Sequence, residues 1–259
     1  AVDAVQVSYQ PLTSLLDPLE AADSNSTPVH EKLGGNVMMR MRVGRGDLAA
    51  SFARADRIVR GKYDMPRLSA APMEGRALLV FYEPGQDQLT LWSSTQTPYR
   101  TKTHLETLLP RPPANIRVVA PDVGGGFGQK VEVWPEDLAL CYLAITLGRP
   151  IKWVEERWEN MLAYQARGYV GEVEAAVKSD GSILGMRIRM IADVGAYSLT
   201  STPGPPVNAV RRCAGPYAIP DMEVEGLSVI TNKPPTGPYR GAGGPEGAFF
   251  MERTIDLIA

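Results

Sequence analysis

Apolar and polar positions alternate along some stretches of the chain and follow a helical period along others, which predicts a mixture of strands and helices. Strands are predicted over residues 58–63, 77–82, 88–93, 116–120, 151–155, 170–178, 183–192 and 222–231. Helices are predicted over residues 47–55, 98–109, 135–148 and 246–258. The turns Pro84-Gly85-Gln86-Asp87 and Ser179-Asp180-Gly181 indicate two hairpins. Because strands and helices do not alternate strictly, the predicted fold class is α+β, or mixed α/β.

The first 36 residues differ in pattern from the rest of the chain. The opening AVDAVQVSYQPL reads as a strand, but Pro and Ser breaks follow it and apolar periodicity is weak. We therefore predict that residues 1–36 are a connector from a preceding domain and that residues 37–259 form one domain, which can divide into two subdomains. The opening residues lack an initiator Met and do not read as a signal peptide, so we expect the chain to begin within a longer gene product or to be cut from one.

Composition narrows the class of protein. The chain is 44% hydrophobic and 22% charged, which is typical of a globular protein. Its net charge is -2 and it has no basic block, so nucleic acid is not an expected partner. No apolar run approaches the roughly 20 residues that a membrane-spanning helix needs. We expect a cytoplasmic protein.

Cysteine and histidine are scarce. The two cysteines, Cys141 and Cys213, form neither a disulfide framework nor an iron–sulfur motif. Cys141 lies in a leucine-rich stretch and is expected to be a small buried apolar residue. Two isolated histidines, His30 and His104, do not make a zinc site. A transition metal, if present, must be held by something other than these side chains.

Two glycine-rich turns are the candidate binding elements. The first glycine loop, residues 124–128, follows a predicted strand, and the second glycine loop, residues 238–245, precedes a helix. Clustered glycines let the backbone approach a ligand and let consecutive N–H groups face an anion or oxo group. The first loop fits neither a Rossmann motif, which would need Gly at Gln129, nor a P-loop, which needs Gly-Lys-Ser/Thr. A tight strand–helix turn remains the alternative.

Arg240 precedes the glycines of the second loop. Its planar guanidinium could donate to a phosphate or another oxyanion, or it could be a surface Arg beside a turn. Two such loops in one chain suggest an extended ligand that carries negative charge, without identifying it.

Several motifs in order resemble the molybdenum-binding subunit of the xanthine oxidase family. They are Ser94-Thr95-Gln96, Ala120-Pro121-Asp122-Val123-Gly124-Gly125-Gly126-Phe127-Gly128-Gln129-Lys130 and Pro238-Tyr239-Arg240-Gly241-Ala242-Gly243-Gly244-Pro245-Glu246. Pro72-Met73-Glu74-Gly75-Arg76-Ala77 and Arg149-Pro150-Ile151-Lys152-Trp153-Val154-Glu155 resemble the carbon monoxide dehydrogenase-like branch. One such motif is weak evidence, whereas five in order over nearly the whole chain are strong. Residues 37–259 would then be the first molybdopterin-binding domain.

The resemblance implies a cofactor and roles for particular residues. The cofactor would be molybdopterin, in bacteria usually its cytosine dinucleotide, whose dithiolene holds the molybdenum. Gln96 would hydrogen-bond the apical oxo ligand, and the backbone at Phe127 and Gly128 would approach the same ligand and the pterin. Gly125 and Gly126 would also bind the cofactor. The backbone amide of Arg240 would contact the cofactor. Such contacts tune a metal by orienting its ligands.

The family's reaction is hydroxylation of a carbon next to a heteroatom, with water as the oxygen source and a Glu as base. Electrons leave through two [2Fe–2S] clusters toward FAD on other domains or subunits. The base lies in a G-x-G-E stretch, and this chain has none. We therefore assign no catalytic residue here, and expect a missing segment or a partner chain to supply the base and much of the dinucleotide pocket.

Three positions bear on the substrate. Purine oxidisers carry Glu where Val131 stands and an aromatic residue where Ala242 stands, which argues against xanthine. Carbon monoxide dehydrogenases carry Cys where Gly241 stands, which argues against a copper–molybdenum site. Small side chains at these positions leave room for an aldehyde or an aromatic N-heterocycle.

Four further residues could line the site. Glu74 and Glu132 are expected to be solvated or paired, and Trp134 and Trp153 to be packing residues. A non-catalytic scaffold or assembly subunit with the same fold and no cofactor remains the alternative function. Intact Gln96 favours the enzyme, because a scaffold has no need of it.

Overall fold

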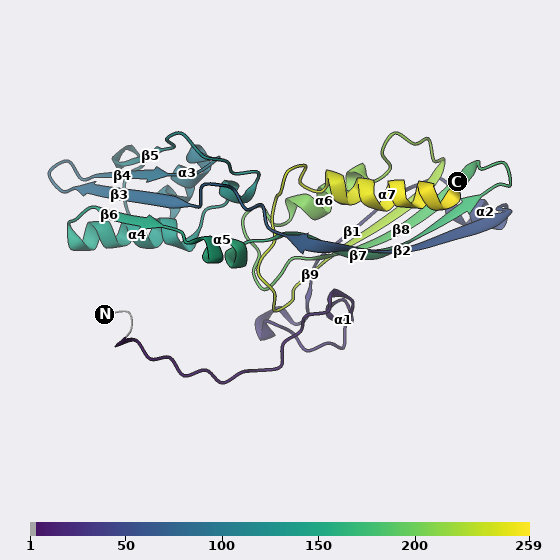
Figure 1. The fold of residues 1–259 in the computed structure, drawn as a ribbon, viewed down its shortest axis with the longest axis horizontal. Coiled ribbons are helices and arrows are strands. Elements are labelled where there is room, and N and C mark those ends of the chain that lie inside the picture. The colour runs from purple at the N-terminus through teal and green to yellow at the C-terminus, as the bar shows by residue number, and fades with distance from the viewer. Residues whose placement is uncertain (1–3) are drawn as a thin grey trace.

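The computed structural model describes residues 4–259, which form two lobes side by side along the long axis of the molecule (Figure 1). The large lobe contains a five-stranded sheet of order β1-β9-β8-β7-β2, and the small lobe contains a four-stranded sheet of order β5-β4-β3-β6. The small lobe is inserted between β2 and β7 in the chain. Each sheet contains one parallel pair, β8 with β9 and β4 with β5, among antiparallel pairs. The predicted mixed α/β fold class is confirmed.

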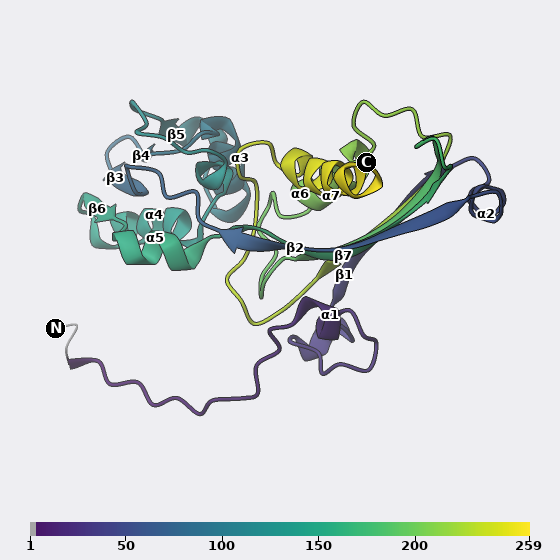
Figure 2. The same ribbon diagram turned by 45° about the vertical axis from the view of Figure 1, so that its right-hand side comes forward.

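The large lobe buries one face of its sheet under two helices. Its strands are β1 (Val37–Arg45), β2 (Arg57–Leu68), β7 (Ala166–Val177), β8 (Ile183–Asp193) and β9 (Asp221–Val229). Its helices are α2 (Leu48–Ala53), α6 (Gly204–Arg212) and α7 (Gly244–Ile258). Helices α6 and α7 cover the concave side of the curved sheet, where Ile188, Val224 and Phe250 belong to one buried core (Figure 2). Period-two alternation in the strands produces this apolar face.

The segment before β1 lies on the other face of the large sheet (Figure 2). It contains the short helix α1 (Pro18–Ala21) and the 3₁₀ turn η2 (Glu31–Leu33). Leu15 and Ala21 pack there against Ile191 and Leu227. Residues 1–3 of the predicted first strand lie outside the described residues. Residues 5–17 form no strand, so that part of the prediction is wrong.

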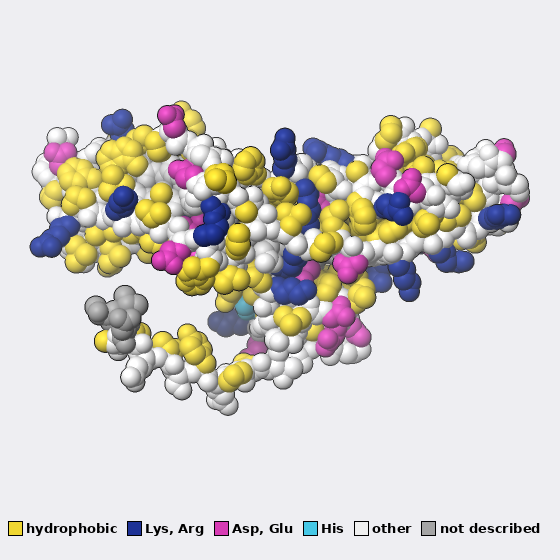
Figure 3. Space-filling view, viewed as in Figure 1, with side chains coloured by type: hydrophobic (Ala, Val, Ile, Leu, Met, Phe, Trp, Pro, Cys, Tyr) yellow, Lys and Arg dark blue, Asp and Glu magenta, His cyan; other side chains and the backbone are white. Residues whose placement is uncertain are grey.

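The small lobe also has one face covered by helices. Its strands are β3 (Ala77–Glu83), β4 (Gln88–Ser93), β5 (Ile116–Val119) and β6 (Ile151–Val154). Its helical elements are α3 (Pro98–Leu108), η3 (Pro113–Asn115), η4 (Gln129–Val131), α4 (Pro135–Leu147) and α5 (Arg157–Ala163). Leu78, Leu91, Leu105 and Cys141 share its core, which confirms Cys141 as a buried apolar residue. Hydrophobic side chains also gather on the outside of this lobe (Figure 3).

Most predicted elements are found, but α1, β1, α5 and α6 were not predicted. Strand β1 alternates Met with Arg, and its Arg40 and Arg42 are paired with Glu225 and Glu223 on β9. Helix α6 begins Gly-Pro-Pro, residues that usually interrupt helices except in the first turn. None of the helices within residues 4–259 is long and apolar enough to cross a membrane.

Candidate functional site

The two glycine loops meet where the lobes join. The first loop follows β5 in the small lobe, and the second follows β9 in the large lobe. The backbone N–H of Arg240 donates to the carbonyl oxygen of Phe127 at 2.9 Å. A Cβ atom on Gly128, where φ is +110°, would overlap the carbonyl oxygen of Pro238. Only glycine therefore permits this approach of the two backbones.

Gln96 lies at the same junction. It comes shortly after the end of β4, and its backbone N–H donates to the carbonyl of Lys130 at 2.8 Å. Its side-chain Oε1 accepts a hydrogen bond from the N–H of Gly128 at 2.9 Å. A Cβ atom on Gly126 would overlap that side chain. The Nε2 group is thereby left as the outer end of an exposed amide, with no acceptor among residues 4–259.

Several backbone donors of the loops are not used within the protein. The N–H groups of Gly126, Phe127, Gly241 and Gly243 have no acceptor in the described part of the chain. Gly126 and Phe127 are consecutive, and such unused N–H groups in a turn with left-handed residues form a concavity that binds anions. This donor set fits an anionic, oxo-bearing cofactor such as molybdopterin. Of the residues expected to bind the cofactor, the structure brings together Gln96 and the two loops.

Arg240 differs from the expectation in one respect. Its backbone amide, expected to contact the cofactor, is engaged with Phe127. Its carbonyl accepts a hydrogen bond from Nη2 of Arg167 at 3.0 Å. Its own guanidinium is in no hydrogen bond or ion pair with residues 4–259, and the residue is exposed. The part of Arg240 that remains available to a ligand is therefore its side chain.

Backbone strain concentrates at this junction. Phe127, Arg167 and Ala242 have φ values of +54°, +64° and +40°, a region that non-glycine residues rarely occupy. Such conformations cost free energy and persist where the surrounding structure holds them, as it often does at functional sites.

An ion pair supports the first loop from behind. The buried Nζ of Lys130 lies 2.8 Å from Oε2 of Glu74, and the N–H of Gly124 donates to the same oxygen at 2.5 Å. Partial burial raises the pKa of Glu74, but the hydrogen bonds from Lys130 and Gly124 outweigh it, so the pKa is lowered. Glu74 was expected to be either solvated or paired, and it is a paired carboxylate that is held ionised.

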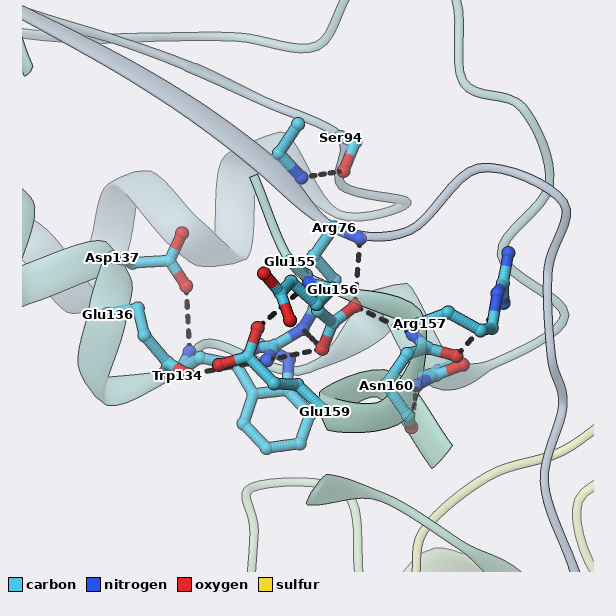
Figure 4. Close-up of polar contacts among 12 residues, drawn as sticks. Arg76, Ser94, Trp134, Glu136, Asp137, Glu155, Glu156, Arg157, Glu159 and Asn160 are labelled. Atoms are coloured by element: carbon cyan, nitrogen blue, oxygen red, sulfur yellow. Dashed lines mark hydrogen bonds and ion pairs between the residues drawn. The ribbon is translucent and has the colours of Figure 1, made fainter. Parts of the chain in front are cut away.

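A second buried pair lies deeper in the small lobe (Figure 4). The Arg76 guanidinium stacks between the rings of Trp134 and Trp153, at 4.1 and 5.2 Å from their centroids. Its Nη2 lies 2.7 Å from Oε1 of Glu155, and the other oxygen of that carboxylate accepts from Nδ2 of Asn160 at 2.7 Å. Burial raises the pKa of Glu155, yet these bonds lower it overall. Both tryptophans are packing residues, as predicted.

Two further titratable groups in the small lobe are structural. Asp137 accepts a hydrogen bond from the N–H of Trp134 at 2.8 Å at the start of α4, and burial raises its pKa to about 6. Burial raises the pKa of the Cys141 thiol to about 12, which keeps it neutral. Within residues 4–259, His, Cys, Asp and Glu form no group of three that could hold a metal ion.

Glu132 connects the lobes beside the glycine loops. Its buried carboxylate accepts from Oγ1 of Thr200 at 2.5 Å and from the N–H of Ser201 at 3.2 Å. It is therefore paired. Val131 and Ala242, which were expected to line the substrate pocket, are both half-buried, and they form hydrogen bonds through their backbone. The carbonyl of Val131 accepts from Thr97, and the carbonyl of Ala242 accepts from Asn208. Their role toward a substrate stays a prediction.

Comparison with known proteins gives the family. The sequence model of the protein family described as the molybdopterin cofactor-binding domain matches residues 29–259 of this chain. The chain belongs to this family. The resemblance to the molybdenum-binding subunits of xanthine oxidase-type and carbon monoxide dehydrogenase-type enzymes is thereby confirmed.

Curated relatives agree over the whole chain. The chain is 35% identical to the 6-hydroxypseudooxynicotine dehydrogenase complex subunit gamma of Paenarthrobacter nicotinovorans, over 99% of this chain and 32% of that protein. It is 34% identical to the carbon monoxide dehydrogenase large chain of Hydrogenophaga pseudoflava, over 100% of this chain and 34% of that protein. The chain thus spans about a third of the length of these relatives.

Solved structures show the same fold. Quinoline 2-oxidoreductase from Pseudomonas putida 86 superposes with a TM-score of 0.93 at 36% identity, over 98% of this chain and 33% of that one. A Cu,Mo-CO dehydrogenase superposes with a TM-score of 0.91 at 30% identity, over 100% of this chain and 35% of that one. The loops described above therefore belong to a molybdopterin-binding fold.

Proposed function

We propose that this chain is part of a molybdenum hydroxylase that oxidises an aldehyde or an aromatic N-heterocycle, with water as the oxygen source. The observation that carries the proposal is the junction at which Gln96, the first glycine loop and the second glycine loop meet. Electrons would pass to [2Fe–2S] and FAD partners. The complex would work in the cytoplasm, as expected from the sequence.

The chain's own residues would bind and orient the cofactor. The unused N–H groups of Gly126 and Phe127, with those of Gly241 and Gly243, would donate to its anionic and oxo groups. Gln96 would donate through Nε2, because Oε1 is already engaged with Gly128. Molybdopterin, in its cytosine dinucleotide form, would supply the redox chemistry when bound. The metal would be held by the pterin.

The general base would come from outside these 259 residues. Glu74 and Glu132 are each engaged by at least two donors. The pKa of Glu74 is also lowered, so Glu74 is poorly suited to take a proton. A further segment of the large subunit or a partner chain would then supply the catalytic Glu and much of the dinucleotide pocket. The partners would be the remaining molybdenum-binding part and the iron–sulfur and flavin units.

The substrate class rests on small side chains near the loops. Val131 and Ala242 stand where purine oxidisers have Glu and an aromatic residue, and Gly241 stands where carbon monoxide dehydrogenases have Cys. Relatives named for quinoline and for 6-hydroxypseudooxynicotine are consistent with an N-heterocycle or a compound related to one.

The test is oxidation by the native complex, purified with its co-purifying chains, in ¹⁸O-labelled water. We expect hydroxylation of quinoline or benzaldehyde with the label in the product, and little oxidation of xanthine. Preferred oxidation of xanthine would contradict the substrate class. A complex that contains no molybdenum and oxidises none of these compounds would favour the non-catalytic scaffold.

A further inference from the structure

A buried ion pair lies directly behind the second glycine loop. Nη1 of Arg167, at the start of β7, is 2.6 Å from Oε2 of Glu246, in the first turn of α7. The two side chains are only 7% and 2% exposed. Negative charge at this end of α7 is favoured by the helix dipole. Glu246 ends the second glycine motif in the sequence, but Arg167 was not singled out there, and the pairing of the two depends on the tertiary fold.

Arg167 makes two further contacts with the loop itself. Its Nη2 donates to the carbonyl oxygen of Arg240 at 3.0 Å, and its guanidinium carbon lies 5.1 Å from the ring centroid of Tyr239. One side chain therefore holds α7 and two consecutive residues of the loop at once. A planar guanidinium can do this because its donors are fixed in a fork, whereas the point charge of a lysine cannot.

The contact fixes the Arg240 backbone from both sides. The peptide N–H of Arg240 donates to Phe127 in the small lobe, and its carbonyl accepts from Arg167 in the large lobe. The direction of the next N–H group, that of Gly241, is set by the same peptide plane. Arg167 itself has a φ of +64° and is followed by Gly168 at +79°. The backbone is therefore strained at the residue whose side chain reaches the loop.

We propose that Arg167, held by Glu246, is a positioning residue that sets the second glycine loop against the first and thereby fixes the donors that hold molybdopterin. This rests on the proposed function. Arg167 acts through the loop backbone and is buried behind it. Its loss should weaken cofactor retention about tenfold to a hundredfold, the effect typical of residues that orient the contacts of a metal site.

The experiment uses the native complex and three variants. Arg167→Met alone would leave Glu246 buried without a partner and could fail to fold, so both are replaced in Arg167→Met/Glu246→Met. Arg167→Lys keeps the charge but not the fork. Arg111→Met is the matched control, because Arg111 also pairs with an acid, Asp87, and stacks on a ring, that of Tyr82, but it contacts neither glycine loop.

The readouts are molybdenum and pterin per chain after prolonged dialysis, the Mo(V) electron paramagnetic resonance spectrum, and the thermal midpoint. We expect about tenfold lower molybdenum retention and an altered spectrum in the double variant, intermediate retention in Arg167→Lys, and native values in Arg111→Met. Retention and spectrum unchanged in both Arg167 variants would overturn the inference. A native complex that holds no molybdenum would instead overturn the proposed function on which the inference rests.

Discussion

Oε1 of Gln96 accepts a hydrogen bond from the N–H of Gly128 at 2.9 Å. This bond fixes which end of the exposed amide faces outward. It also ties the segment after β4 to Gly128, where the absence of a side chain lets the second glycine loop approach the first. The orientation of one side chain and the junction of two lobes are thus parts of one arrangement.

Replacing Gln96 by Glu should lower turnover without destabilising the fold. A carboxylate can still accept from Gly128, but it cannot donate to an oxo ligand. We expect the free energy of unfolding to change by less than about 0.5 kcal/mol, as for other exposed positions. Turnover of the native complex should fall about tenfold to a hundredfold. Gln10→Glu adds the same charge at an exposed position away from the loops and should leave turnover unchanged. Equal turnover in the two variants would contradict a donor role for Gln96.

Gly128→Ala should break the junction of the loops. The new Cβ would overlap the carbonyl oxygen of Pro238, and the φ of +110° is strained for alanine. We expect a loss of about 2 kcal/mol or more in the free energy of unfolding by denaturant, with loss of molybdenum. Gly85→Ala is the control, because nothing lies within 4 Å of a Cβ there. Equal losses in the free energy of unfolding for Gly128→Ala and Gly85→Ala would contradict the account.

The contact of Glu132 with Thr200 should couple the lobes energetically. A double-mutant cycle with Glu132→Gln and Thr200→Val isolates the hydrogen bond between a buried carboxylate and a hydroxyl. Hydrogen bonds to charged groups contribute more than neutral ones, so we expect a coupling of about 1.5 to 3 kcal/mol in unfolding experiments. Additive effects of the two substitutions would show that the bond does not hold the lobes together.

Asp137 should give the small lobe a distinct dependence on pH. Burial raises its pKa in the folded protein to about 6, from an ordinary value of 3.8, so the folded state binds more protons between these values. The contribution of Asp137 to the free energy of unfolding is therefore fully present below about pH 4, and it is lost as the pH rises to about 6. Asp137→Asn removes this loss and can still accept from Trp134. The variant should gain up to about 3 kcal/mol relative to the native protein between pH 4 and 6. A difference that does not vary with pH would contradict this.

The fold was predictable wherever the determinants are local. Pro98 and Pro135 stand in the first turns of α3 and α4, and Gly148 ends α4 in a left-handed conformation, so these signals need no tertiary partner. Val5 and Val7 show that alternation alone is insufficient. Both are exposed, and no strand forms there within the described residues. A strand is defined by its neighbour.

The candidate site was predictable in part for the same reason. The glycine loops and Gln96 are visible as motifs in the sequence, and the fold brings them together. The supports behind them are not visible, because Arg167 meets Glu246, and Glu132 meets Thr200, only after the lobes have packed. The engagement of the Arg240 amide with Phe127 is likewise a product of the lobe junction, which no motif encodes.

The most direct test of the account is the molybdenum content of the native complex, measured by elemental mass spectrometry together with native mass spectrometry of the co-purifying chains. The account predicts about one molybdenum for each copy of this chain, since one pair of glycine loops would hold one cofactor. It also predicts iron in the same sample. A complex without molybdenum would contradict the account and leave the glycine junction as a structural feature of a non-catalytic subunit.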